Sequence, residues 1–574
     1  MRTWNRFCVA LTLVGVAAGA GVAQTQTADQ TQPQASASTG TPVTTVSQAI
    51  DRIVAREHDQ DAVIRRYNPI VETYVQDMKA DTEMGIVPFK DHYYLGQASL
   101  ANGVADESML NKKKKSKVEE INPLSHRGGS PDSSYVPEGF VQMIYVDPNG
   151  FDRQHYVFDY VGREFLGEVR CLVFDVTPLP KSGKGRFIGR VWAEDQGFTI
   201  VRFNGMYTSG GEMNGYNVHF DSWRLNLQPD LWLPAFVFSQ ESDLTNSSGN
   251  GVRFKAQTRF WGYNLEVLNR EIEQSHQTLD APVAAEDNSS AQQDRSPIEA
   301  ERQWQQQAEV NVINRLERIG LLAPRGEVDK VLETVVNNLE VTNNLDIEPD
   351  IQCRIMLTGT LESFSIGHTI VLSRGLIDVL PDEASLATML AQELAAIIVT
   401  KPSTDQWGFN DTTNVTTAEA LSRFSFKATP ADVEMSDKKA VELLKHSPYQ
   451  DKLGNSALFL KQLSADSQAL PALISARLGN GVGLSSALLS LGPALQTDKL
   501  DQIAALPIGG RVKVDPWSDR VELLRTKPVA LHSAREKMPF EVTPFLPFLT
   551  RYHEPAKTGK QQSSALASKD PAHR

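Results

Sequence analysis

The sequence is poor in the residues that build disulfide scaffolds and metal clusters. It has 3 cysteines in 574 residues, too few for a disulfide framework or a four-thiolate zinc or iron–sulfur site. Its 11 histidines are scattered, and the closest two, His553 and His573, are 20 residues apart. A zinc site built from two histidines on one turn of a helix is therefore excluded.

Positive charge and long apolar runs are also scarce. The chain has 57 Lys and Arg against 70 Asp and Glu, a net charge of −13, so we expect no nucleic-acid partner, which would require a basic face. The apolar run near the N-terminus is too short for a standard membrane span, and no other window reaches the ~18 consecutive apolar residues of one. A hydrophobic content of 41% and about 100–200 residues per domain predict two to four globular domains.

The N-terminus has the pattern of a targeting segment. Arg2 and Arg6 precede an apolar run over Phe7–Val16, and small residues follow up to Ala23. This pattern predicts a secretory signal peptide over residues 1–23 and a periplasmic or secreted protein. An uncleaved N-terminal membrane anchor is the alternative.

The remaining segments before the first predicted domain are simple. Residues 24–47 are Thr, Gln, Ser and Ala without periodicity, which predicts a disordered spacer.

Cys8 would leave with the signal peptide. Cys171 and Cys353 fall in different predicted domains, so we expect two buried free thiols and no bridge.

Residues 48–272 predict a β-rich domain. Apolar residues between Val46 and Met78 recur at helical spacing and predict one or two helices broken near Pro69. Short runs of Val, Phe, Tyr and Trp then alternate with turn residues, which predicts an antiparallel half-barrel covered by those helices. The expected strands are Phe140–Val146, His155–Val161, Glu168–Val176, Arg186–Ala193, Thr199–Phe203, Val218–Leu225, Trp232–Gln240 and Val252–Phe260.

A linker over residues 273–297 leads to a mainly helical domain over 298–525, followed by a C-terminal tail over 526–574. The fold class is therefore α+β. In the second domain we expect helices over Ile298–Ile319, Val328–Leu339, 381–399 and Asp432–Leu444 and short strands over Cys353–Leu357 and Thr369–Leu372.

Part of the second domain resembles a peptidase family. The stretch Phe364–Ile377 leads into the helix with Gln392 and Glu393, and Asp437–Leu444 and Asp515–Val521 follow. In this order the four pieces resemble the zinc metallopeptidases of the HtpX, Oma and CAAX-prenyl-protease type. The resemblance spans residues ~300–525 and implies a zincin-like fold.

The same resemblance implies that the metal site is lost. The positions of the two H-E-x-x-H histidines hold Gln392 and Ala396, and the third ligand position holds Met435. An amide, a methyl group and a thioether are poor or impossible zinc ligands. Glu393 remains as a vestigial general base, and Asp515 stands at the family's oxyanion position. We therefore expect no cofactor.

Two features suggest partners. The segment Gly367, His368, Thr369, Ile370 and Val371 corresponds to the family's edge strand and is predicted to bind an extended peptide or an unfolded envelope protein by strand addition. Three stretches of the first domain, Cys171–Pro178, Gly189–Glu194 and Phe198–Phe203, resemble strands of the lipoprotein-carrier and sorting fold. That resemblance implies a lipid or acyl-chain ligand.

The sequence thus leaves three hypotheses open. The leading one is a non-catalytic binding or scaffold protein of the cell envelope. The first alternative is an active zinc metalloendopeptidase whose ligands lie at other positions. The second is a carrier of an apolar ligand through the first domain.

Overall fold

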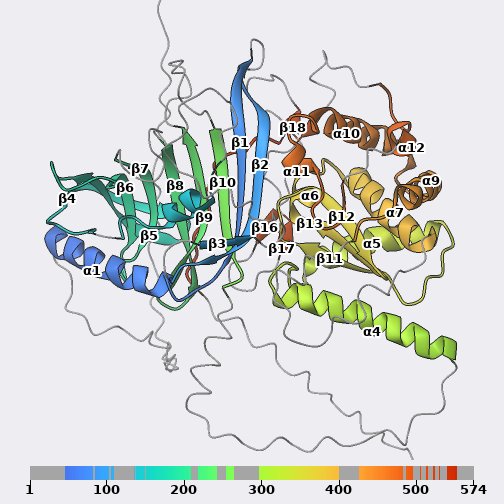
Figure 1. The fold of residues 1–574 in the computed structure, drawn as a ribbon, viewed down its shortest axis with the longest axis horizontal. Coiled ribbons are helices and arrows are strands. Elements are labelled where there is room, and N and C mark those ends of the chain that lie inside the picture. Colours follow the sequence, from blue (N-terminus) through green and yellow to red (C-terminus); the bar gives the residue numbers. More distant parts are fainter. Residues whose placement is uncertain are drawn as a thin grey trace, which may run out of the picture. The chain divides into compact units, whose positions relative to one another are not determined.

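The first half of the chain is built on one large antiparallel sheet (Figure 1). The computed structural model describes residues 45–81, 85–101, 105–108, 135, 137–148, 150–208, 218–241, 254–263, 297–399, 426–481, 486–494, 504–505, 512–514, 521–523, 529–530 and 540–552. Residues from Val46 onward group into one compact unit. The predicted signal peptide, the spacer to residue 44, most of the linker and Asp515 lie outside the described residues.

The sheet has 10 strands in the order β3-β2-β1-β10-β9-β8-β7-β6-β5-β4. Every neighbouring pair is antiparallel. Most neighbours are consecutive strands, which connect directly, whereas β1 pairs with β10 and the consecutive strands β3 and β4 lie at opposite edges of the sheet. The strands are β1 (Ile70–Asp81), β2 (Gly85–Ser99), β3 (Ala105–Ser108), β4 (Tyr156–Leu166), β5 (Val169–Pro178), β6 (Phe187–Glu194), β7 (Ile200–Tyr207), β8 (Val218–Gln228), β9 (Leu231–Glu241) and β10 (Phe254–Trp261).

Seven of the eight expected strands are confirmed as β4 to β10. The expected strand Phe140–Val146 is wrong: it forms the helical turns α2 (Pro137–Val141) and η1 (Gln142–Ile144). The expected helix α1 (Val46–Ile64) is confirmed, but its continuation toward Met78 is strand β1. The apolar residues of β1 repeat at helical spacing because the strand is buried on both faces and its polar side chains bond to other segments.

The second half contains the mixed sheet β11-β13-β12-β14 with helices around it. The long helices and the strands of this sheet are α4 (Pro297–Arg318), α5 (Glu327–Thr342), α7 (Glu383–Val399), α9 (Pro430–Lys445), α10 (Leu453–Asp466), β11 (Gln352–Met356), β12 (Glu362–Ile366), β13 (Thr369–Ser373) and β14 (Asn480–Gly481). Short elements are α6 (Arg374–Val379), η4 (Gln450–Lys452), α11 (Pro471–Ile474), α12 (Ser486–Leu489), β15 (Ala504–Ala505), β16 (Val512–Val514), β17 (Val521–Leu523) and β18 (Val529–Ala530). The four helices and two strands expected here are confirmed.

The expected peptide-binding edge strand is wrong. Strand β13 lies inside its sheet, parallel to β11 on one side and antiparallel to β12 on the other. Its backbone groups are therefore already paired and offer no free edge for an added strand. Gly367 forms the turn before β13 with φ +55°, and the backbone N–H of His368 donates to Glu309 at 3.3 Å.

Part of the predicted C-terminal tail is bound to the first half. Residues 540–552 contact β1, β10, β9, β8 and the β4–β5 turn, and Phe540, Val542 and Leu549 are fully buried. The Gln76 side chain on β1 bonds both to the Phe540 carbonyl at 2.7 Å and to the Val542 N–H at 2.8 Å. This segment therefore completes the core of the large sheet.

Among the described helices, none combines the length and the apolar character needed to cross a bilayer.

Candidate functional site

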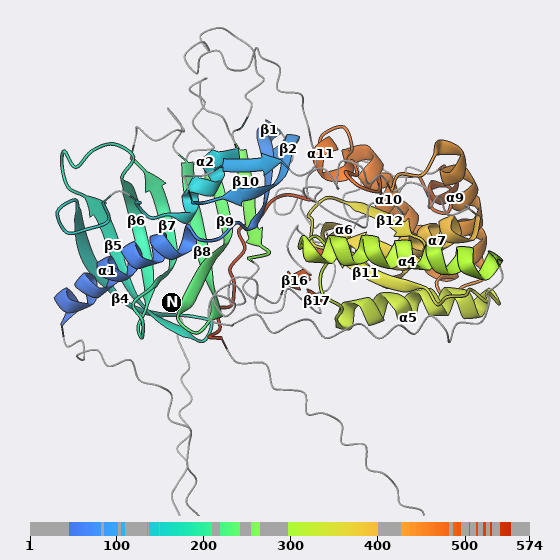
Figure 2. The same ribbon diagram turned by 60° about the horizontal axis from the view of Figure 1, so that its bottom comes forward.

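Helix α1 runs across one face of the large sheet (Figure 2). Its buried residues recur at a spacing of three or four, as expected for one helix face. They are Ala49, Ile50, Ile53, Glu57, Gln60, Asp61 and Ile64. Three of the seven are polar, so the underside of this helix is held to the sheet by directional bonds as well as by apolar packing.

The central bond of this contact joins Glu57 to Arg224 of β8. Arg224 is 0% exposed and donates to the two Glu57 carboxylate oxygens at 2.6 and 2.7 Å. It also donates to the carbonyls of Ile200 and Ile144, at 3.0 and 3.2 Å. Burial opposes the charge, but the Glu57 carboxylate keeps the pKa of Arg224 above its ordinary value. We call Glu57, Asp61 and Arg224 the latch.

Asp61 is the third member of the latch and is one helical turn beyond Glu57. Burial and the neighbouring Glu57 charge raise the pKa of Asp61 to about 7, although Arg224 acts in the opposite direction. The Asp61 Oδ1 atom and the Arg224 Nε atom are buried without a hydrogen-bond partner. The latch is therefore incompletely satisfied, which makes the contact between α1 and the sheet less favourable than a fully paired network.

Aromatic side chains lie on the sheet beneath the latch. The Arg224 guanidinium is 5.5 Å from the centre of the Phe203 ring. Phe203 belongs to an aromatic cluster in which the centres of neighbouring rings are 4.9–6.4 Å apart. Its members are Phe187, Phe203, Tyr207 and Phe220. Phe203 is the ring beside the latch, whereas Tyr207 donates to the backbone carbonyls of Gln142 and Tyr145.

Sequence reasoning missed the latch, although one signal was present. Glu57 and Asp61 fall on the same helical stripe as Ile53 and Ile64. An acidic residue in an apolar stripe requires a buried partner. The sequence does not reveal that this partner is Arg224, because β8 reaches α1 only through the sheet topology.

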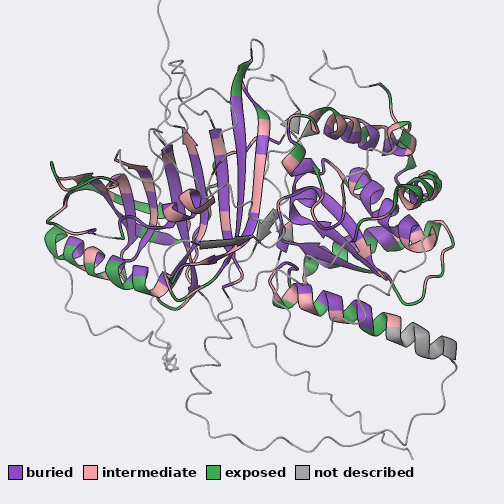
Figure 3. Cartoon of the chain, in the orientation of Figure 1, coloured by how far each residue is buried: buried purple, intermediate pink, exposed green. Residues whose placement is uncertain are grey.

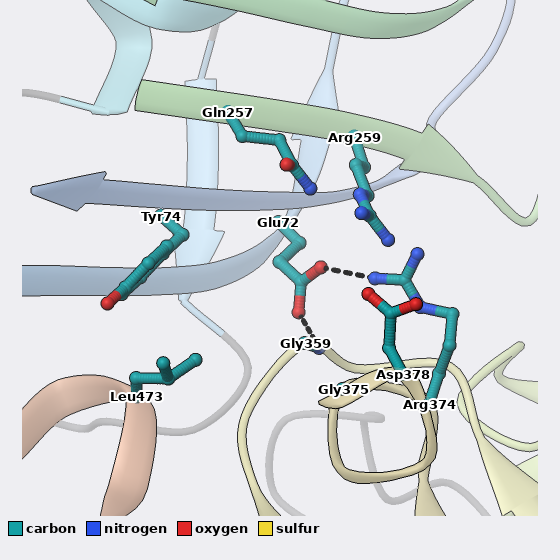
Figure 4. Close-up of a pocket in the computed structure, with 9 residues that line it drawn as sticks. All are labelled: Glu72, Tyr74, Gln257, Arg259, Gly359, Arg374, Gly375, Asp378 and Leu473. Atoms are coloured by element: carbon teal, nitrogen blue, oxygen red, sulfur yellow. Dashed lines mark hydrogen bonds and ion pairs between the residues drawn. The ribbon is translucent and has the colours of Figure 1, made fainter. Parts of the chain in front are cut away.

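A second polar site joins strand β1 to the second half (Figure 4). Glu72 on β1 accepts from Arg374 at 3.2 Å, from Tyr93 at 2.7 Å and from the Gly359 N–H. Burial raises the pKa of Glu72, while Arg374 lowers it. Gly375 allows the close approach of Gly359, because a Cβ at position 375 would overlap the Gly359 carbonyl oxygen.

The lining of this pocket is balanced in charge. Its charged residues are Glu72, Asp378, Arg259 and Arg374. Because Glu72 already bonds to Arg374, to Gly359 and to Tyr93 on β2, the site is best understood as a structural junction. We assign it no ligand.

The residues singled out on α7 are brought together with α9. Gln392 donates to Asp437 at 2.9 Å, and both side chains are buried. Glu393 accepts from Ser363 of β12 at 2.6 Å. Burial raises the pKa of Glu393 to about 7, although bonds from Ser363 and Asn480 lower it. Its second oxygen is buried without a partner.

These residues do not fit a zinc ion. The Gln392 amide is engaged by Asp437, Ala396 offers only a methyl group, and Met435 is 48% exposed on α9. Within the described part of the chain, no group of three or more His, Cys, Asp or Glu side chains is placed to hold a metal. Cys171 and Cys353 are buried free thiols, and burial raises the pKa of each.

Comparisons with known proteins give little guidance. No protein-family model matches the sequence, and no curated protein matches it. The metallopeptidase resemblance has no counterpart in these two comparisons and stays a prediction.

Solved structures give distant similarities. An outer-membrane lipoprotein-sorting protein domain from Vibrio parahaemolyticus is 10% identical, with a TM-score of 0.18, over 39% of this chain and 98% of that chain. A DUF1329 family protein from Desulfovibrio piger is 11% identical, with a TM-score of 0.21, over 40% and 98%. The MucA/MucB complex of Pseudomonas aeruginosa is 9% identical, with a TM-score of 0.13, over 39% and 96%. TM-scores this low do not establish a common fold.

Proposed function

We propose that the chain is a non-catalytic binding protein of the cell envelope that takes an apolar ligand between α1 and the large sheet. The observation that carries this proposal is the latch: a helix held over an aromatic cluster by a buried Arg–Glu pair with unpartnered polar atoms nearby. The envelope location rests on the predicted signal peptide.

Helix α1 is attached to the sheet by polar bonds as well as by apolar packing. Its buried apolar residues are Ala49, Ile50, Ile53 and Ile64, and three polar residues are buried beside them, so part of the attachment depends on polar bonds. A ligand that buries apolar surface against Phe203 and its neighbours would replace the weaker helix contact. The ligand class that fits is an acyl chain or a similar elongated apolar molecule, because the exposed face would be lined by aromatic rings.

The test is binding of a fluorescent fatty-acid analogue by the purified protein. Glu57→Gln keeps the shape of the side chain but weakens the latch, so the open form becomes more populated and the apparent affinity rises several-fold. Asp221→Asn is the matched control, because Asp221 forms a similar two-bond pair with Arg202, at 2.9 Å, away from α1.

Two outcomes contradict the proposal. One is probe binding no tighter than that of an unrelated folded protein. The other is an equal change in affinity for Glu57→Gln and Asp221→Asn, because the effect would then follow general destabilisation. Competition by unlabelled fatty acid but not by a short-chain carboxylate supports an apolar site.

We also infer that the region around α7 and α9 is a scaffold without metal chemistry. The Gln392–Asp437 and Glu393–Ser363 bonds support this inference. The purified protein is then expected to contain well under one zinc per chain, and chelator should leave its melting temperature unchanged. Stoichiometric zinc with chelator-sensitive melting would favour the metallopeptidase alternative.

A further inference from the structure

Strand β4 ends the large sheet and has an open edge. It pairs with β5 on one side, and among the described residues no strand pairs with its other side. Along these 11 residues most side chains are exposed, whereas β5 beside it is largely buried (Figure 3). An edge of this length presents unpaired N–H and C=O groups that can pair with another strand.

The exposed side chains of β4 are unusually apolar. Val157, Tyr160, Val161 and Phe165 are all exposed, and Phe165 reaches 66%. Clustered exposed apolar side chains on an open edge mark an interaction surface or an aggregation hazard. The strand carries only three charges, Asp159, Arg163 and Glu164.

The register against β5 shows which side chains share a face. Phe158 and Tyr160 lie opposite Val176 and Phe174, and a bulge at Val161 shifts the register. Beyond the bulge, Arg163 and Phe165 lie opposite Leu172 and Arg170. Alternate residues of β5 point to the same face, so Phe158, Tyr160, Arg163 and Phe165 also share one face.

We propose that two copies of the chain associate through β4, antiparallel and about a two-fold axis at the bulge. This arrangement places the Phe158–Tyr160 end of one strand beside the Arg163–Phe165 end of the other on the same face. Aromatic rings then meet an aromatic ring or a guanidinium, both of which are favourable contacts. The surface is thus complementary to itself, which favours a second copy as the partner.

The size of the β4 surface determines how tightly the two copies are expected to associate. Eleven residues on each side fall short of the roughly 20–30 residues per side in a standard stable interface. The dimer is therefore weak, with dissociation in the micromolar range, and the bulge and the charges limit pairing to one partner.

The first test is sedimentation of the purified protein over a range of concentrations from about 1 to 100 µM. The protein is expected to change from monomer to dimer. Val157→Lys with Phe165→Lys places two charges on the edge and weakens the dimer at least tenfold. Val341→Lys is the matched control, because Val341 is 65% exposed on α5 and should leave the equilibrium unchanged.

The second test locates the contact. Val161→Cys places a thiol next to the two-fold axis, so mild oxidation should produce a covalent dimer in which the two new cysteines are joined. Val341→Cys and the parent protein, whose Cys171 and Cys353 are buried, should form none.

Three results overturn the proposal: a monomer at every concentration, a dimer that the two lysines leave intact, or growth beyond the dimer. Growth would show that β4 pairs with the opposite edge strand β3, which generates filaments. The proposal is independent of ligand binding, so the lysine variant should bind the fatty-acid probe like the parent protein.

Discussion

Two of the buried acidic sites of the molecule, one in each half, handle charge differently. In the sheet half, Glu57 and Asp61 lie beneath α1 beside the Arg224 guanidinium. In the helical half, Glu393 faces hydroxyl and amide groups, and the Gln392 amide donates to Asp437. Burial raises the pKa of Asp61 and of Glu393 to about 7 in both cases.

The difference lies in what each site depends on. A buried ion pair repays the cost of desolvation only while both partners are present. A site held by hydroxyl and amide donors needs only its hydrogen bonds, and loss of one such donor costs less than loss of a cation. Both halves are therefore sensitive to pH, through Asp61 and Glu393, but only the sheet half depends on a single buried cation, Arg224.

The largest effect is expected for Arg224→Leu, which leaves Glu57 buried without its cation. The free energy of unfolding should fall by about 3–5 kcal/mol, as for other broken buried pairs. Urea denaturation measures the loss. Arg190→Leu is the control, because Arg190 bonds to Asp175 with the same two-bond geometry at an exposed site and should cost less than about 1 kcal/mol. Equal losses would show that burial does not distinguish the two pairs.

A second, opposite effect is expected for Glu393→Gln. A carboxyl group whose pKa is raised on folding holds its proton in the folded state, so the free energy of unfolding falls as pH rises from about 4.5 to 7. The amide of the Gln variant cannot ionise, so the variant does not lose stability as the pH rises. It should therefore be more stable than the parent at pH 8 by about 2–3 kcal/mol. Near pH 4 the two proteins should melt alike.

Melting curves across pH 4–8 provide the measurement. Asp61→Asn is the companion variant and should show the same sign, because the Asp61 carboxyl also holds its proton more tightly when folded. A parent protein whose stability rises steadily up to pH 8, with no gain in either variant, contradicts raised pKa values at both sites.

The sequence predicted local structure better than contacts between distant segments. The strands β4 to β10 were found because their apolar and turn residues alternate in short runs. The strand β1 was missed because it is buried on both faces and carries Glu72 and Gln76, whose partners Arg374 and Phe540 lie about 300 and 460 residues away. Periodicity does not encode such partners.

The sequence pattern also does not reveal which distant residues meet in a candidate site. The positions Gln392 and Glu393 were singled out through a resemblance that no matching family model supports, and the structure places each of them in a buried hydrogen bond. The latch has no motif, since Glu57 and Arg224 are 167 residues apart. The predicted edge strand failed because strand order in a sheet depends on β11 and β12, and not on the residues of β13 itself.

The smallest effect is expected for Gln392→Leu, the neutral counterpart of Arg224→Leu. The substitution removes one donor from the buried Asp437 carboxylate and should cost about 1–2 kcal/mol, because a neutral amide contributes less than a guanidinium. Urea denaturation of Gln392→Leu, Asp437→Leu and the double variant completes a thermodynamic cycle. The double variant should recover part of the loss, since neither residue then leaves the polar group of the other buried without this hydrogen bond. A cost as large as that of Arg224→Leu would mean that Gln392 supports a charge as strongly as a cation does, and the contrast between the two halves would no longer hold.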